Sequence, residues 1–78
     1  MKHIVFMKPA EKYLNKQPAQ TMARILLAIY NLPKGDVKIL QGSDNPCRLR
    51  VGDVRVIFKM EGQQIIVRDI NNRGDIYK

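Results

Sequence analysis

One stretch of sequence decides the fold: RLRVGDVRVIF, which extends from Arg48 to Phe58. Apolar and basic residues alternate on both sides of the dipeptide Gly52-Asp53. Alternation with period two is typical of a strand with one buried side, and a glycine-containing dipeptide between two such runs predicts a tight hairpin. A two-residue turn also fixes which residues lie opposite each other. We therefore predict two antiparallel strands in a register that places Arg50 opposite Arg55.

The predicted sheet extends on both sides of this hairpin. The dipeptide Glu61-Gly62 precedes a further run rich in valine and isoleucine, which we interpret as the return strand after a second two-residue turn. In that register Arg55 also lies opposite Arg68. Short apolar segments near the N-terminus and after the turn 33–36 complete the sheet, the first of them pairing along an edge. The predicted strands are 3–6, 37–40, 47–51, 54–60 and 63–70.

Two helices are expected before the sheet. Pro9 is suited to open a helix over 10–16, and Gln17-Pro18 ends that helix and begins a second one over 18–32. The second segment has the i, i+3, i+4, i+7 apolar spacing of an amphipathic helix, carried by Met22, Ile25, Leu26, Ile29 and Leu32. We predict an α+β fold, with a small antiparallel β-sheet (a meander plus an N-terminal edge strand) and two N-terminal helices packed on one face. At this length residues 1–78 are expected to form a single domain.

The predicted register sorts the strand side chains onto two faces. The apolar face, which the second helix covers, carries Leu49, Val51, Val54, Val56, Phe58, Ile65 and Val67. The other face carries Arg48, Arg50, Arg55, Arg68, Lys59 and Gln64, and no carboxylate neutralises the arginines in this register. An ordinary solvated face is the alternative, but such faces usually mix charge signs. Arginine binds phosphate through a planar fork of two hydrogen bonds, so we predict an anion site that suits a nucleic-acid backbone.

Composition limits the classes of function. Lysine plus arginine number 14 against 7 aspartates plus glutamates, a net charge of +7 that indicates an acidic or polyanionic partner. No run of eighteen apolar residues is present, so no membrane partner is expected. One cysteine and one histidine predict neither a disulfide nor a metal site, and we expect a cytoplasmic protein without a cofactor. By alternation Cys47 belongs to the core side, and Tyr13 and Tyr30 are interpreted as packing residues on the helices.

The sequence resembles the RelE branch of the RelE/ParE toxin superfamily. Three segments carry the resemblance: LPKGDVK at 32–38, the hairpin from Arg48 to Phe58, and the tail NRGDIYK at 72–78. The resemblance implies a toxin of a type II toxin–antitoxin system, a ribosome-dependent mRNA endoribonuclease that inhibits translation. It also implies two partners, a cognate antitoxin that keeps the toxin silent and mRNA on the ribosome. A ParE-like inhibitor of DNA gyrase and a catalytically inactive antitoxin-binding domain are the alternatives.

The same resemblance implies the site residues. The expected catalytic residues are Arg48, Arg50, Arg55, Arg73 and Tyr77, and RNA binding is expected from Arg48, Arg50, Lys59 and Arg68. Metal-independent cleavage by the 2′-hydroxyl requires removal of its proton, stabilisation of charge on the phosphate and protonation of the leaving 5′-oxygen. Nearby cations favour a phenolate, so Tyr77 is interpreted as a base, or as a ring that stacks on a nucleobase. Many relatives have a histidine where this chain has Asn72, and tyrosine where it has Cys47, which leaves the general acid and base open.

Overall fold

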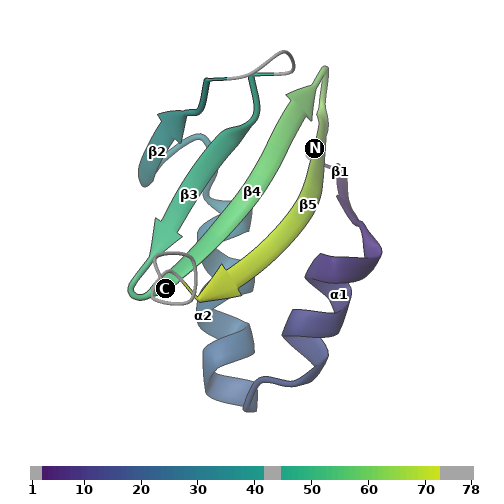
Figure 1. Cartoon of the computed structure of the whole chain (residues 1–78), viewed down its shortest axis with the longest axis vertical. Coiled ribbons are helices and arrows are strands. Elements are labelled where there is room, and N and C mark those ends of the chain that lie inside the picture. Colours follow the sequence, from purple (N-terminus) through teal and green to yellow (C-terminus); the bar gives the residue numbers. More distant parts are fainter. Residues whose placement is uncertain (1–2, 42–44, 73–78) are drawn as a thin grey trace.

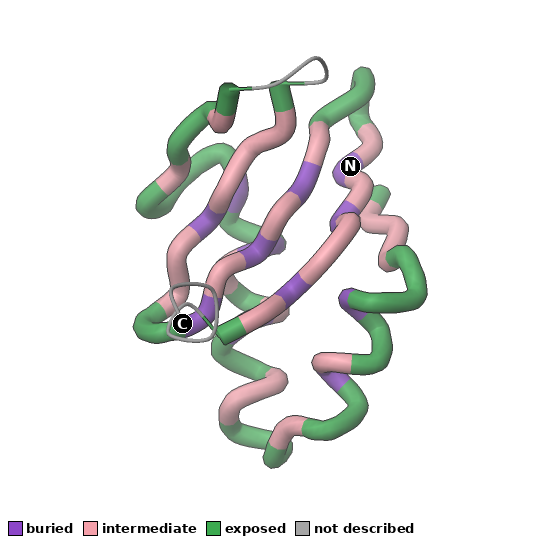
Figure 2. The backbone as a smooth tube through the Cα atoms, viewed as in Figure 1, coloured by how far each residue is buried: buried purple, intermediate pink, exposed green. Residues whose placement is uncertain are grey.

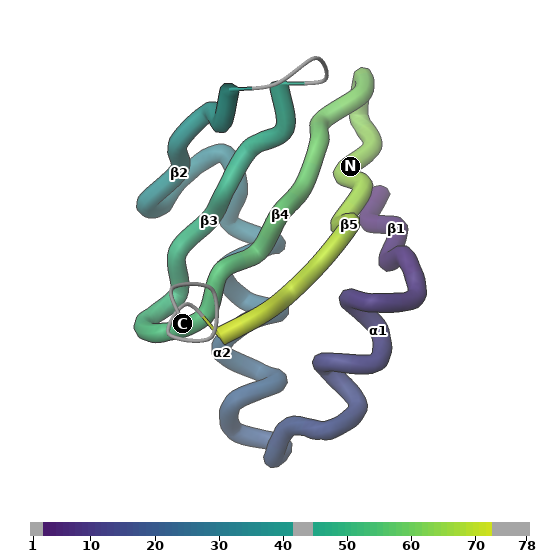
Figure 3. Tube along the Cα trace, viewed as in Figure 1, coloured from purple at the N-terminus to yellow at the C-terminus, as the bar shows by residue number. Residues whose placement is uncertain are grey.

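The computed structural model describes residues 3–41 and 45–72 and contains two helices and one five-stranded sheet (Figure 1). In chain order the elements are β1 (His3–Phe6), α1 (Lys8–Asn15), α2 (Ala19–Tyr30), β2 (Asp36–Ile39), β3 (Cys47–Val51), β4 (Val54–Glu61) and β5 (Gln64–Asn72). The strand order is β1-β5-β4-β3-β2. Strand β1 pairs in parallel with the first half of β5, so the first and last strands of the sequence lie side by side, whereas β2 to β5 form an antiparallel meander (Figure 3). The predicted α+β fold is confirmed.

Both helices pack on one face of the sheet, behind it in the view of Figure 1. Pro9 stands in the first turn of α1, and Pro18 occupies the N-cap position of α2, as expected for residues that cannot donate a backbone hydrogen bond. Each helix buries an apolar stripe against the sheet. No helix in the described residues is long and apolar enough to cross a membrane.

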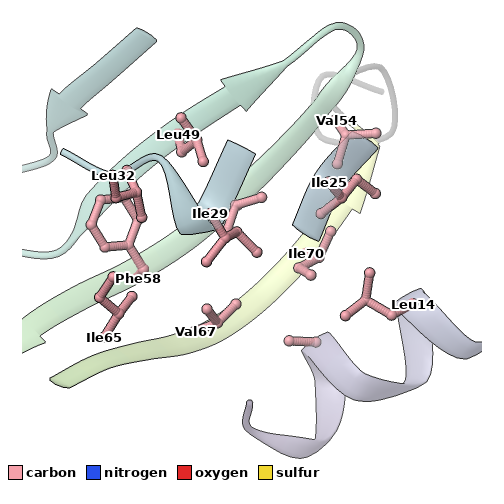
Figure 4. Close-up of a cluster of buried hydrophobic side chains, with 12 residues drawn as sticks. Leu14, Ile25, Ile29, Leu32, Leu49, Val54, Phe58, Ile65, Val67 and Ile70 are labelled. Carbon is pink, nitrogen blue, oxygen red and sulfur yellow. The ribbon is translucent and has the colours of Figure 1, made fainter. Parts of the chain in front are cut away.

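The core lies between the helices and the sheet (Figure 4). Its buried members are Ala10, Leu14, Ile25, Ile29, Leu32, Leu49, Val54, Val56, Phe58, Ile65, Val67 and Ile70. Each large side chain removed from water here contributes about 1.5–3 kcal/mol. Cys47 and Tyr13 pack against this core as partly buried residues, as predicted. The prediction for Tyr30 is wrong, because its side chain is 61% exposed on α2.

The hairpin between β3 and β4 has the predicted register. Val51 lies opposite Val54 and Arg50 opposite Arg55, and Gly52 adopts a positive φ of 59° in the turn. Alternation along β4 therefore directs every second side chain into the core, which Figure 2 shows as buried and partly buried residues in turn.

The hairpin between β4 and β5 differs from the prediction by two residues. Glu61 lies opposite Gln64, so the turn is Gly62-Gln63 and not Glu61-Gly62. Gly62 has φ of 62°, the conformation that a type II′ turn requires at its first central position. A shift of two residues leaves every side chain on its predicted face.

A β-bulge in β5 changes the faces after this point. Val67 lies opposite Phe58 and Asp69 opposite Ile57, so Arg68 is the additional residue in β5. The bulge turns Asp69 away from the core and Ile70, which is 2% exposed, into it. The shift of two residues and the bulge together make the predicted pairing of Arg55 with Arg68 wrong: Arg55 lies opposite Asn71.

Candidate functional site

The face of the sheet opposite the helices, here called the open face, carries basic side chains on adjacent strands. Pairing between β2, β3, β4 and β5 aligns their residues in rows across the sheet. One row contains Asp36, Arg50, Arg55 and Asn71. The next row contains Lys38, Arg48, Ile57 and Asp69. Arg48, Arg50 and Arg55 are thus neighbours on two adjacent strands, and they are called the arginine cluster below.

The arginine cluster is partly covered by its surroundings. The side chain of Arg48 is 13% exposed and that of Arg50 is 37% exposed. The Nε atoms of all three arginines are shielded from solvent, and none has a hydrogen-bond acceptor among residues 3–41 and 45–72. Buried donors without acceptors cost free energy, about 1–3 kcal/mol each and more when charged. An anion that accepted these hydrogen bonds would recover that cost.

A carboxylate lies at one side of the cluster, contrary to the prediction that none would. Oδ1 of Asp36 accepts a hydrogen bond from Nη2 of Arg48 at 3.3 Å, and its Oδ2 lies 3.6 Å from Nε of Arg50. The second distance is an electrostatic contact, too long for a hydrogen bond. The sequence interpretation missed Asp36 because it assigned this residue to the turn 33–36, whereas β2 begins at Asp36.

Two further polar residues lie on the other side of the cluster, on β5. Nδ2 of Asn71 donates a hydrogen bond to Oδ2 of Asp69 at 3.0 Å. The Oδ1 atom of Asn71 is buried and accepts no hydrogen bond within the described part of the chain. The bulge at Arg68 brings both residues to the open face.

The remaining predicted residues lie next to the cluster along the sheet or outside the described residues. Lys59 and Arg68 are partly buried; Lys59 is in the row that contains Ile66, and Arg68 lies at the bulge. Arg73 and Tyr77 lie outside the described residues. The structure therefore brings together the hairpin arginines, with Lys59 in the row next to that of Arg48 and Arg68 at the bulge opposite Ile57 and Phe58.

Asn72, for which the family resemblance implied a histidine in relatives, is the last residue of β5. It lies opposite Val54, a core position, and lines a cavity of about 310 Å³ on the helix side together with Tyr13 and Arg24. Asn72 is thus directed away from the arginine cluster. No group of three or more histidine, cysteine, aspartate or glutamate residues in the described segments could hold a metal ion.

Fold and site together define a small α+β protein with two helices on one sheet face and an arginine cluster on the other. No family model matches the sequence. Toxin RelE3 of Methanocaldococcus jannaschii is 33% identical over 82 residues, covering 95% of this chain and 93% of the relative. The chain belongs to the RelE toxin family.

Two solved complexes contain similar chains. The RelB–RelE antitoxin–toxin complex from Methanococcus jannaschii matches with a TM-score of 0.74 and 33% identity, covering 94% of both chains. The archaeal RelE–RelB complex from Pyrococcus horikoshii matches with a TM-score of 0.73 and 25% identity, covering 94% of this chain and 96% of the other. Both likenesses extend over nearly the whole chain and agree with the helix-covered sheet described above.

Proposed function

We propose that this protein is the toxin of a type II toxin–antitoxin system and that it inhibits translation by cutting mRNA on the ribosome. The observation that carries the proposal is the arginine cluster, whose three Nε atoms are shielded from water and have no acceptor among the described residues. Guanidinium groups in such an arrangement favour phosphate, and their spread over two strands suits a chain of phosphates better than one small anion.

The proposed cleavage uses the 2′-hydroxyl of the RNA as the nucleophile. Its oxygen attacks the adjacent phosphorus, the bond to the 5′-oxygen breaks, and the products are a 2′,3′-cyclic phosphate and a 5′-hydroxyl. Arg55, together with Arg73, would stabilise the charge that develops on the phosphate. Arg48 and Arg50 would hold the RNA backbone and help proton transfer, and the RNA would continue over the open face toward the outlying cations, Lys59 and Arg68.

Tyr77 is proposed to remove the proton of the 2′-hydroxyl or to stack on a nucleobase. A free tyrosine has a pKa of about 10, and neighbouring guanidinium groups would favour its phenolate form. The orientation of Asn72 toward the helix side supports a general base elsewhere than at that position. Tyr77 is the residue to which the family resemblance gives this role, and stacking on a nucleobase is its alternative role.

A cognate antitoxin is the second partner that we propose. The similar solved chains come from antitoxin–toxin complexes, and the net charge of +7 would attract an acidic partner. Apolar side chains also remain exposed, among them Leu27 at 63% and Tyr30 at 61% on α2. We place residues 1–78, as one domain, in the cytoplasm where mRNA is translated.

The proposal is tested by induced expression of the protein and of two variants at Tyr77, with mRNA 5′ ends mapped and DNA-damage markers measured in the same cells. The expected result is mRNA breaks without DNA damage. If the phenol transfers a proton, Tyr77→Phe should cleave about 10²- to 10⁴-fold more slowly in a ribosome–mRNA assay, the usual scale for one acid–base group. If the ring only stacks, Tyr77→Phe should be nearly silent and Tyr77→Ala severe.

Intact mRNA together with DNA damage would favour the gyrase-inhibitor alternative. Neither effect in growing cells would favour an inactive antitoxin-binding domain. Normal cleavage by both Tyr77 variants would remove Tyr77 from the catalytic residues while leaving the nuclease itself in place.

A further inference from the structure

Asp36 occupies the place at the arginine cluster where an anion would be expected. Its two carboxylate oxygens contact different arginines, Oδ1 at 3.3 Å from Arg48 Nη2 and Oδ2 at 3.6 Å from Arg50 Nε. A phosphate group likewise offers two oxygens on one centre to two guanidinium groups. The carboxylate therefore makes, within the chain, the kind of contact that the cluster would make with an RNA phosphate.

Two features indicate that this contact is replaceable. Asp36 is the first residue of a short edge strand, β2, and its side chain is 56% exposed. Exposed ion pairs contribute little to stability, and the longer of the two contacts is not a hydrogen bond. The Nε of Arg48 stays without an acceptor among the described residues despite the nearby carboxylate. Asp36 thus neutralises part of the cluster while leaving its donors unsatisfied.

We propose that Asp36 is an intramolecular competitor for the phosphate position at Arg48 and Arg50, and that it thereby sets how strongly the open face binds anions. A single phosphate gains little by displacing the carboxylate, because it exchanges one anion for another. An RNA strand that also contacts Arg55 gains contacts that Asp36 does not make, since among residues 3–41 and 45–72 the carboxylate pairs with the β3 arginines alone. Asp36 is therefore a specificity-determining residue that favours polynucleotide phosphates over isolated ones. This inference rests on the proposed function, because it takes RNA as the ligand of the cluster.

The test compares Asp36→Asn with Glu11→Gln. Glu11 is an exposed residue in the first turn of α1, on the helix-covered side of the sheet, so both variants raise the net charge by one unit while only the first removes the contact at the cluster. The probes are inorganic phosphate and a single-stranded oligoribonucleotide with 2′-O-methyl groups, which cannot be cleaved by 2′-hydroxyl attack. We expect Asp36→Asn to bind the oligonucleotide about three- to tenfold more tightly than wild type, the scale of two exposed ion pairs. Glu11→Gln should change the affinity less than about twofold, because an exposed charge on the other side of the sheet is screened.

Two readouts separate competition from a structural role. The slope of log affinity against log salt should be steeper in Asp36→Asn by about 0.7, the value for one additional phosphate neutralised on a single strand. Inorganic phosphate should gain relatively more than the oligonucleotide, which reduces the discrimination between them. In wild type, the Asp36 side-chain carboxyl ¹³C resonance should shift when the oligonucleotide is added, a measurement that needs no variant.

The outcomes distinguish the inference from the proposed function. Equal affinities and salt slopes for the two variants, or an Asp36 resonance that does not respond to bound RNA, would overturn the inference even if the wild type cleaves mRNA. If Asp36→Asn binds the oligonucleotide more tightly but the wild type does not cleave mRNA, the competition by Asp36 would be supported and the proposed nuclease activity would be refuted. Failure of both probes to bind any of the three proteins would overturn both.

Discussion

At the scale of single residues, Arg55 is the member of the cluster whose removal is most informative. It lies opposite Arg50 on β3 and opposite Asn71 on β5, and its Nε has no acceptor in the described residues. Like charges directly opposite each other destabilise a sheet, so Arg55→Ala should relieve repulsion without opening a cavity in the core. We expect an equal or higher melting temperature together with lost toxicity, measured by thermal unfolding and by growth after induction.

Arg24→Ala is the matched control for Arg55→Ala, because Arg24 is an exposed arginine on α2, outside the predicted site. The control should stay toxic. A large drop in melting temperature for Arg55→Ala would instead mean that the cluster serves the fold, and retained toxicity would remove Arg55 from the proposed mechanism.

The residues of the cluster were predictable because period-two alternation around a two-residue turn leaves only one arrangement for them. The contact of Asp36 with the cluster was not predictable, because it depends on the residue at which the short edge strand β2 begins. The first residue of a strand can differ by one or two positions with little change in the secondary-structure preference of the sequence. The partners of a side chain on a neighbouring strand are set by pairing between segments far apart in the sequence. The two predictions at the C-terminus, Arg73 and Tyr77, stay predictions.

At the scale of elements, the two hairpins show which sequence signals are sufficient to predict the position of a turn. Each turn has glycine at its first central position with φ near 60°, Gly52 before Asp53 and Gly62 before Gln63. A type II′ turn has glycine at its first central position, and this rule applied to both dipeptides would have predicted the second turn correctly as well as the first. The bulge also left a trace, since Arg68 and Asp69 are consecutive polar residues that break the alternation before Ile70. Alternation alone could not say which strand would absorb the extra residue.

Deletion of Arg68 tests the role of the bulge. Phe58 and Ile57 are consecutive in β4 and lie opposite Val67 and Asp69, so removal of the additional residue joins these pairs into a regular ladder. Asp69 then stays on the open face and Ile70 stays in the core, because alternation from Val67 places them there. Denaturant unfolding should therefore show a deletion variant that keeps its core and a stability close to that of the wild type.

The control for this deletion is Arg68→Ala, which removes the charge and keeps the backbone insertion. It should unfold close to the wild type. If the deletion variant were strongly destabilised relative to Arg68→Ala, the bulge would be required for the bend of β5, because the faces of Asp69, Ile70 and Asn71 are the same with and without the additional residue.

At the scale of the whole molecule, the two sides of the sheet have different roles. The helices cover the apolar side and supply the core, whereas the open face gathers the basic residues that the core excludes. A chain of 78 residues buries only about 60% of the surface that its unfolded form exposes, so its stability is modest. A net charge of +7 lowers the stability of the folded state further, because the positive charges repel one another.

A bound antitoxin should offset both weaknesses. A ligand that binds only the folded state at a concentration of 100 times its Kd adds about 2.7 kcal/mol of stability. In a domain of this size, each 1 kcal/mol raises the melting temperature by about 4–8 °C. We therefore expect the product of the adjacent gene to form a complex with the purified chain and to raise its melting temperature by roughly 10–20 °C.

The dependence of this complex on salt identifies the surface that the antitoxin covers. An acidic segment over the arginine cluster should dissociate more readily as salt rises and should lose affinity for Arg55→Ala. An apolar segment on the helices should tolerate salt and lose affinity when Leu27, exposed on α2, is replaced by alanine. Arg24→Ala serves again as the charge-matched control. If no complex forms at micromolar concentration of either protein, the chain does not have this partner, and the excess of positive charge serves RNA binding alone.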